Sequence, residues 1–278
     1  MLITMSSLIL AASAPHCGPG HPSMIEAWRT DGFANPESVI SDGQGGFFVS
    51  NVNGGGSDRD GNGFIARINA SGEITDLDWV SGLDAPKGLA RTQDRLFATD
   101  IDQLIEVDLA TGRVIARHPI EGAQFLNDAA ALPDGEILVS DSAGDRIYSF
   151  DAGVISIWME GEHLDGVNGL LPEEGRLLVT TMARGELLAI DWDSRSVEVL
   201  ATGLTNADGI ARWCDGYILA QWPGIVSHIS ARGRVRTLLD QTEAGVLMND
   251  IIIDGSTLLI PNWNPGSVWA FQLTSLMH

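Results

Sequence analysis

The sequence is poor in positive charge: 16 Lys and Arg residues stand against 37 Asp and Glu residues, and the formal net charge is −21. A surface of this sign repels phosphate backbones and anionic lipid headgroups, so neither nucleic acid nor a membrane surface is an expected partner. Lys87 is the only lysine among the basic residues. Beyond the N-terminus no apolar run reaches about 20 residues, so no membrane-spanning helix is expected.

Cysteine is equally scarce, since Cys17 and Cys214 are the only two. In an exported protein they permit one disulfide, but their spacing does not decide the pairing, and two unpaired thiols are expected. The opening run MLITMSSLILAASA ends in small residues, which predicts a signal peptide over residues 1–14 and a linker over residues 15–23. The expected location is therefore the periplasm or the exterior. The alternative is a mildly apolar tail on a cytoplasmic protein, because the positively charged start of a signal peptide is missing.

Several common catalytic motifs are absent. The sequence has no GxSxG nucleophile elbow and no HExxH, and its six histidines show no zinc-ligand spacing. No Gly-rich stretch joins a strand to a helix, as a phosphate cradle requires. Serine hydrolases of that type, zinc proteases and nucleotide-binding enzymes are therefore not indicated.

What the sequence does contain is a short pattern that occurs six times. Each copy has a polar residue, a short apolar run, a turn with Asp, Gly or Glu, and a second apolar run that ends in a polar residue. The apolar runs are too short for helices and are bounded by turn residues, so they are expected to be strands. The aligned polar residues are Glu37, Lys87, Asn127, Asn168, Asp208 and Asn249.

The spacing of the copies predicts the fold. An interval of about forty residues matches one blade of four antiparallel strands, so the chain is expected to be all-β, a six-bladed β-propeller in a single domain over residues 24–278. The first interval is longer because of an insertion at residues 53–63. The last copy shows only three strands, and residues 24–31 resemble an outer strand. We therefore expect the N-terminal strand to complete the last blade and remove an open edge.

The insertion itself contains Asp58, Asp60 and Asn62 at the spacing of the first half of a Ca²⁺ loop. Its twelfth position is Asn69 instead of Glu, and a strand follows instead of a helix. A flexible surface loop is the prediction for this segment.

Antiparallel order places the start of each first strand and the end of each second strand at one mouth of the channel. The expected strand ends there are Asn51, Asp100, Asp141, Thr181, Trp222 and Asn262. Converging carboxylate and amide oxygens suit one hard divalent cation. The structural alternative is that Asn and Asp cap strands and form turns at these positions.

Four of these segments resemble the SMP-30/gluconolactonase/LRE family, which includes regucalcin and the gluconolactonases and whose members are six-bladed propellers. They are PES with Glu37, LND with Asn127, NG with Asn168 and DG with Asp208. The resemblance implies that Glu37, Asn168 and Asp208 bind one divalent cation (Ca, Mg, Mn or Zn) and that Asn127 contacts metal-bound water or substrate. Phe125 stands where lactonases of this family commonly carry Arg, so the resemblance carries over better for the metal site than for the substrate.

The leading hypothesis is therefore a metal-dependent hydrolase of a lactone or related small ester. Asp208 is the expected general base. Lys87 is expected either to stabilise the oxyanion or receive the product carboxylate, or to form an ion pair with a nearby carboxylate. Asp100 and Trp222 are further candidates for contact with a small-molecule substrate, although Trp222 and Trp263 also suit packing between blades. The alternatives are a non-catalytic exported propeller that binds a small ligand or a protein, and an isomerase or lyase of a sugar acid.

Overall fold

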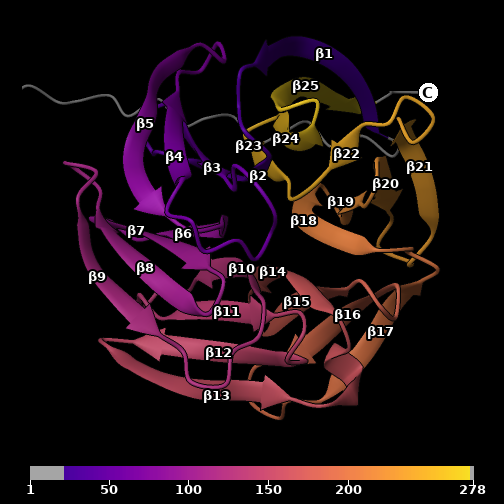
Figure 1. Ribbon diagram of the computed structural model, residues 1–278. Coiled ribbons are helices and arrows are strands. Elements are labelled where there is room, and N and C mark those ends of the chain that lie inside the picture. The colour runs from indigo at the N-terminus through magenta and orange to yellow at the C-terminus, as the bar shows by residue number, and fades with distance from the viewer. Residues whose placement is uncertain (1–21, 276–278) are drawn as a thin grey trace, which may run out of the picture.

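The computed structural model describes residues 22–275 and contains six β-sheets arranged around a central channel (Figure 1). This confirms the predicted six-bladed β-propeller. The described residues include a single short helical turn, η1 (Glu162–Leu164). Within residues 22–275 no helix has the length and apolarity needed to span a bilayer.

Five blades are built from four consecutive antiparallel strands each. Blade 1 comprises β2 (Pro36–Ser41), β3 (Phe47–Asn51), β4 (Gly63–Ile68) and β5 (Ile74–Leu83), and blade 2 comprises β6 (Pro86–Arg91), β7 (Arg95–Asp100), β8 (Gln103–Asp108) and β9 (Val114–Pro119). Blade 3 comprises β10 (Leu126–Ala131), β11 (Ile137–Asp141), β12 (Arg146–Asp151) and β13 (Val154–Glu160). Blade 4 comprises β14 (Val167–Glu173), β15 (Arg176–Thr181), β16 (Glu186–Asp191) and β17 (Val197–Thr202). Blade 5 comprises β18 (Ala207–Trp213), β19 (Gly216–Gln221), β20 (Ile225–Ile229) and β21 (Val235–Asp240).

The sixth blade joins the two ends of the described chain. Its strands are β22 (Leu247–Met248), β23 (Ile252–Asp254), β24 (Thr257–Asn264), β25 (Ser267–Ser275) and the N-terminal β1 (Pro22–Asp31). β1 pairs antiparallel with β25 along its whole length, and Figure 1 shows the indigo β1 beside the yellow β25. The prediction that an N-terminal strand closes the ring is confirmed.

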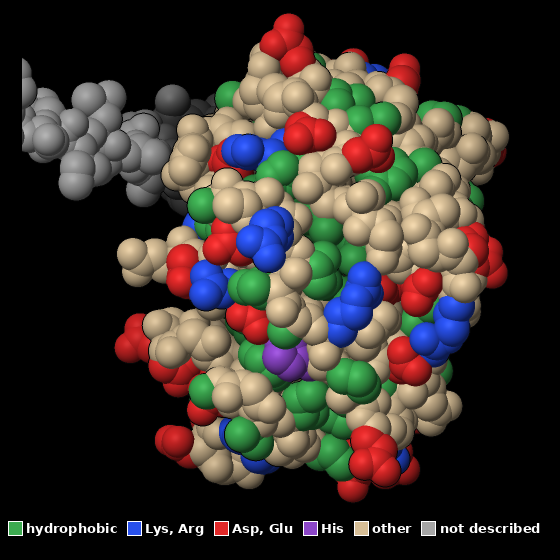
Figure 2. All heavy atoms as spheres, turned by 60° about the vertical axis from the view of Figure 1, so that its left-hand side comes forward, with side chains coloured by type: hydrophobic (Ala, Val, Ile, Leu, Met, Phe, Trp, Pro, Cys, Tyr) green, Lys and Arg blue, Asp and Glu red, His purple; other side chains and the backbone are tan. Residues whose placement is uncertain are grey.

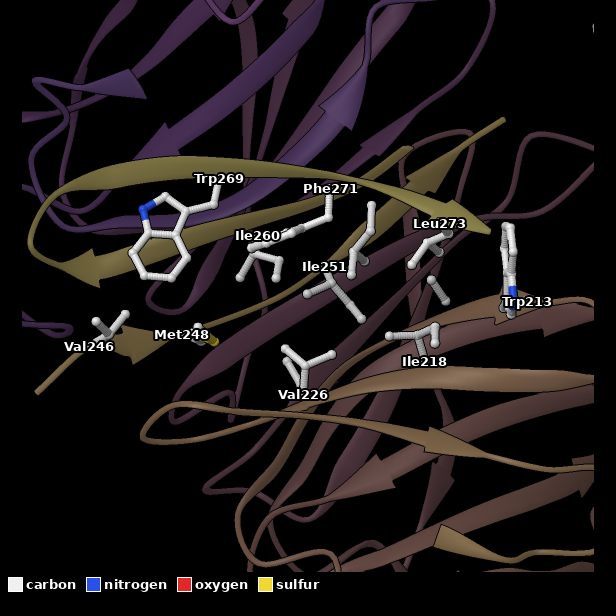
Figure 3. Packing of buried hydrophobic residues seen from close by; sticks show 13 residues of the cluster. Trp213, Ile218, Val226, Val246, Met248, Ile251, Ile260, Trp269, Phe271 and Leu273 are labelled. Carbon is white, nitrogen blue, oxygen red and sulfur yellow. The ribbon is translucent and has the colours of Figure 1, made fainter. Parts of the chain in front are cut away.

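Apolar side chains between neighbouring blades hold the ring together. Between blades 5 and 6, one buried cluster joins Ile218 and Val226 of blade 5 to Met248, Ile251 and Phe271 of blade 6 (Figure 3). Outer strands such as β5 and β9 are largely exposed. On the face shown in Figure 2, acidic, basic and apolar side chains are interspersed without a continuous patch of one charge. The packing between blades therefore makes a frame that fixes the inner strands around the channel.

Each inner strand of blades 1–5 carries a β-bulge at the position of the repeated polar residue. In blade 1, Pro36 pairs with Asn51 and Val39 pairs with Val49, so the inner strand has one extra residue between these pairs. Blades 2–5 show the same shift at the same phase. Bulges re-aim side chains and are frequent near functional sites. Here they set the repeated polar residue and the residue after it at the channel.

Glycine follows the repeated polar residue in blades 2, 4 and 5 for a packing reason. A Cβ at Gly88 would lie 2.4 Å from Cα of Asp128, and one at Gly169 would lie 2.6 Å from the backbone oxygen of Asp208. The NG and DG motifs therefore reflect the close approach of neighbouring inner strands as well as the chemistry of Asn168 and Asp208.

The end of the second strand in blade 5 is Gln221, which pairs with Ala207, and Trp222 lies one residue beyond it. Cys214 is disulfide-bonded, contrary to the expectation of unpaired thiols. Cys17, the predicted signal peptide and nearly all of the predicted linker lie outside the described residues.

Candidate metal and catalytic site

The six repeated polar residues are all buried at one mouth of the channel and are called the mouth ring below. Five are the second residue of an inner strand, and the sixth directly follows β22. The structure therefore brings together the positions predicted from the repeat. Their exposed fractions are 6 % for Glu37, 2 % for Lys87, 7 % for Asn127, 2 % for Asn168, 4 % for Asp208 and 4 % for Asn249.

Glu37 has the most unusual environment in the mouth ring. Its Oε2 is buried and has no hydrogen-bond partner within the described part of the chain. Burial, followed by the charges of Asp208 and Asp250, raises the pKa of Glu37 well above its ordinary value, and Lys87 acts in the opposite direction. A buried carboxylate oxygen without a donor is costly, and native structures contain few of them. A ligand bound at the mouth ring would therefore offset the free-energy cost of burying this oxygen without a hydrogen-bond donor.

Asp208 is also buried among acidic groups, but unlike Glu37 Oε2 its carboxylate accepts hydrogen bonds. Burial and the charge of Asp250 raise the pKa of Asp208 to about 8, whereas hydrogen bonds from the Asn168 side chain and the Gly209 backbone lower it. The backbone oxygen of Asp208 also accepts a hydrogen bond from Thr180 Oγ1 at 2.6 Å. Asp208 is therefore a carboxyl group held in place by its neighbours, with a pKa raised to about 8.

Two further acidic residues, Asp128 and Asp250, were missed by the sequence analysis. Each directly follows a residue of the mouth ring, in the LND and MND segments. Burial raises the pKa of Asp250 to about 6, and it raises that of Asp128 well above its ordinary value. The repeated Asn-Asp pair is the signal that was available. The bulge around Asp128 and the interruption of the inner strand at Asp250 have no clear mark in the sequence.

Lys87 forms no ion pair among the described residues, although one was an open alternative for it. Its ammonium donates to the backbone oxygens of Gly56 at 2.7 Å and Ala85 at 3.1 Å and lies 4.3 Å from the centre of the Phe125 ring. Burial lowers the pKa of Lys87, while the charges of Glu37 and Asp100 raise it. Lys87 is therefore held by neutral oxygens and an aromatic ring beside the acidic groups.

The insertion at residues 53–63, called the mouth loop below, is tethered to blade 2. Arg59 makes two bonds to Asp102, at 2.7 and 3.1 Å, and Gly61 N donates to Asp84 Oδ1 at 3.1 Å. With the contact between Gly56 and Lys87, these bonds fix a segment that the sequence predicted to be a flexible loop. Asp58 accepts a hydrogen bond from Gly55 N inside the loop.

The ends of the second strands serve mainly as anchors. Asp100 is fully buried, and its carboxylate accepts from the backbone N–H groups of Asp84 at 3.1 Å and Ala85 at 2.7 Å. Asp141 accepts in the same way from the two residues before β10. In blades 2 and 3 these bonds tie the end of the second strand to the loop through which the chain enters the same blade. A substrate would reach Asp100 only if that loop moved, and its predicted substrate contact stays a prediction.

Trp222 directly follows β19 of blade 5, Trp263 lies near the end of β24 of blade 6, and the two rings pack against each other. Their ring centroids lie 6.4 Å apart at an interplanar angle of 81°. Trp263 also packs against Val52, Ala85 and Ile101. Packing between blades is thus seen directly, and contact of Trp222 with a substrate stays a prediction.

The predicted metal ligands fit a hard cation by their chemistry. No group of three or more His, Cys, Asp or Glu side chains within residues 22–275 is arranged to hold a metal ion. The predicted set, however, contains two carboxylates, Glu37 and Asp208, together with the amide of Asn168. Carboxylate and amide oxygens are the donors that Ca²⁺ and Mg²⁺ take. The unpartnered Glu37 Oε2 and the repulsion between Glu37 and Asp208 are the structural observations that favour a cation here.

No family model matches this chain, and no curated protein matches it. Solved structures do match. A putative gluconolactonase is 18 % identical with a TM-score of 0.68, over 94 % of this chain and 96 % of its own. The calcium-binding protein regucalcin from Agrobacterium tumefaciens is 17 % identical with a TM-score of 0.63, over 91 % and 96 %. Virginiamycin B lyase from Staphylococcus aureus is 12 % identical with a TM-score of 0.64, over 92 % and 99 %. At these identities the likeness shows the propeller fold alone.

Proposed function

We propose that this protein is a divalent-cation-dependent hydrolase of a lactone or a related small ester. The observation that carries the proposal is the buried, unpartnered Glu37 Oε2 at a channel mouth that it shares with Asp208. Two similar structures support it, since one is described as a putative gluconolactonase and another as a calcium-binding protein.

Glu37, Asn168 and Asp208 would hold the cation. A divalent cation supplies polarisation of the substrate carbonyl and a lowered pKa for an attacking water. It would also offset the repulsion at the channel, because the charge of Asp208 raises the pKa of Glu37. The affinity for the cation is therefore expected to rise with pH as Asp208 loses its proton, through about pH 8.

Asp208 is the group placed to accept a proton from the attacking water. Asn168 and the Gly209 backbone donate to its carboxylate and so fix its orientation. A base held in place in this way typically contributes about a hundredfold to ten-thousandfold to the rate. Asn127 lies in the same mouth ring and is the proposed substrate contact.

Lys87 provides the only lysine ammonium in the protein, and it lies in the mouth ring. An ammonium carries three donors, and backbone oxygens of Gly56 and Ala85 take two of them. We assign the third to the developing oxyanion or to the product carboxylate. The mouth loop and Phe125 hold the ammonium in place and shield it from water.

The proposal is tested by assaying a panel of aldonolactones and simple aliphatic lactones with Ca²⁺, Mg²⁺, Mn²⁺ or Zn²⁺. The wild-type protein should hydrolyse at least one substrate, and a chelator should abolish the activity. Asp208→Asn should lower kcat about a thousandfold, whereas the control Asp193→Asn, on an exposed turn, should not. Absence of turnover with every cation, or equal turnover in Asp208→Asn, overturns the proposal for that panel.

We also propose that the protein is exported, with cleavage after Ala14. The disulfide-bonded Cys214 supports this, because disulfides persist mainly in oxidising compartments. The test is N-terminal sequencing of the protein recovered from the periplasmic and culture fractions, which should begin at Pro15. Recovery of protein that begins at Met1 from the cytoplasm alone contradicts the proposal.

A further inference from the structure

A second cavity lies on the channel axis at the end opposite the mouth ring. The inner strands continue past the ring, and the residue two positions further along each of them lines this cavity, which has a volume of about 300 Å³. All six blades contribute an apolar side chain at that position. They are Val39, Leu89, Ala129, Leu170, Ile210 and Ile251.

The floor of this axial pocket is acidic. Its acidic lining residues are Asp128 and Asp250. Each directly follows a residue of the mouth ring, so the two lie at the end of the pocket that is nearest the ring. Asp250 accepts from Ser38 Oγ and Ile251 N, each at 2.7 Å, and Asp128 accepts from Ala129 N and Leu170 N, each at 2.7 Å. These neutral donors fix both carboxylates but supply no compensating charge.

No cation within the described chain offsets this charge. Neither Asp128 nor Asp250 takes part in an ion pair among residues 22–275. The one basic residue that lines the pocket, Arg212, is exposed and pairs with Glu173. Two fixed carboxylates therefore face an apolar cavity without a counterion, an arrangement whose electrostatic complement is a cation.

We propose that the axial pocket binds a small organic cation with an apolar body, such as a primary alkylammonium. The ammonium lies against Asp128 and Asp250, and the alkyl group packs against the ring of apolar side chains. The apolar walls offer no oxygen donors to a metal ion, and the two carboxylates disfavour an anion. A volume of about 300 Å³ suits a small molecule whose apolar body is buried and whose polar end meets a few placed groups.

The test is calorimetric titration of the full-length protein at pH 8 in the presence of a chelator, so that the mouth ring carries no divalent cation. The probe is 3-methylbutylammonium, and the comparators are its neutral analogue 3-methyl-1-butanol and the anion 3-methylbutanoate. The ammonium should bind at least tenfold more tightly than the alcohol, and the anion should not bind.

Two kinds of variant test the placement. Asp250→Asn should weaken ammonium binding at least tenfold, whereas Asp254→Asn, an exposed residue on the neighbouring strand β23, should leave it unchanged. Ile40→Trp narrows the pocket without touching either carboxylate and should also weaken binding at least tenfold, with exposed Val154→Trp as its control.

Equal affinity for the ammonium and the alcohol overturns the proposal. It is likewise overturned if Asp250→Asn and Ile40→Trp both bind like the wild type, or if only Glu37→Gln at the mouth ring removes binding. If Asp250→Asn does not fold, as judged by circular dichroism and thermal melting, Ile40→Trp and the comparison of the three probes decide the question.

Discussion

Two sets of buried acidic residues lie near the same channel mouth and differ in their hydrogen bonding. Asp100 and Asp141 at the second-strand ends each accept from two or more backbone N–H groups. Glu37 in the mouth ring has an oxygen with no partner, and Asp208 is supported by Asn168 and its own strand. Burial alone therefore does not separate a structural carboxylate from a functional one.

The difference follows from which groups surround each carboxylate. Backbone N–H groups of a loop stabilise a carboxylate without any ligand, so the hydrogen bonds that Asp100 and Asp141 need are supplied by the protein itself. At the mouth ring, by contrast, acidic groups lie near one another: Asp208 and Asp250 raise the pKa of Glu37, and Asp250 raises that of Asp208. Asp100 and Asp141 therefore stabilise the blades. The acidic residues of the mouth ring lower the free energy of unfolding, and a bound cation would restore it.

The largest expected effect is on activity at the mouth ring. Glu37→Gln should lower metal-dependent turnover by about a hundredfold or more, because the proposed cation loses a charged ligand. The same variant should melt no lower than the wild type in metal-free buffer, since it removes a repelling charge. Paired kinetic and thermal measurements check both parts, and a strongly destabilised variant would place Glu37 with the anchoring set.

The converse effect is expected for the anchors. Asp100→Ala should lower the free energy of unfolding by about 3 kcal/mol, because the N–H groups of Asp84 and Ala85 lose their acceptor inside the protein. Denaturant unfolding measures this loss, with exposed Asp94→Ala as the control. An Asp100→Ala variant of normal stability would remove the distinction between the two sets.

The pH dependence of stability sharpens the comparison. The folded-state pKa is about 8 for Asp208 and about 6 for Asp250, against ordinary values of 3.8. The folded state therefore binds more protons than the unfolded state across this interval, and stability falls as pH rises. We expect metal-free protein to lose roughly 1 kcal/mol of unfolding free energy per pH unit between about pH 5 and pH 8. Melting curves across this range, with Asp208→Asn as a flatter control, test the sign, and stability that rises with pH would contradict it.

The smallest expected effect concerns Lys87 and the mouth loop. Lys87→Met keeps most of the aliphatic stem but removes the bonds to the oxygens of Gly56 and Ala85, so stability should fall by about 1 kcal/mol. Limited proteolysis should then cut within residues 53–63 faster than in the wild type. Arg59→Gln, which removes the other tether, is the comparison variant, and unchanged cleavage in both would mean that these contacts do not hold the loop.

The fold and the mouth ring were predictable because the same pattern recurs at the same phase of six blades, and phase alone determines which residues meet. Asp128 was missed because a bulge, invisible in the strand pattern, brings a second residue of the strand to the channel. Asp250 was missed because it lies in the interruption between β22 and β23, which the strand pattern does not show either. The end of β19 was placed one residue late because Trp222 was taken for the end of the strand that Gln221 terminates. The tether between Lys87 and Gly56 joins positions about thirty residues apart, and no local pattern marks such a contact.

The pairing of β1 with β25 has a consequence for folding kinetics. Ser23 and Thr274, which share a hydrogen bond across this pair, are 251 positions apart in the sequence. Contacts of such long range require most of the intervening chain to be ordered first, because the entropy of closing the loop must be overcome before the contact forms. During synthesis β1 emerges early but can pair only after β25 has been made. Ring closure is therefore expected to be a late step in folding.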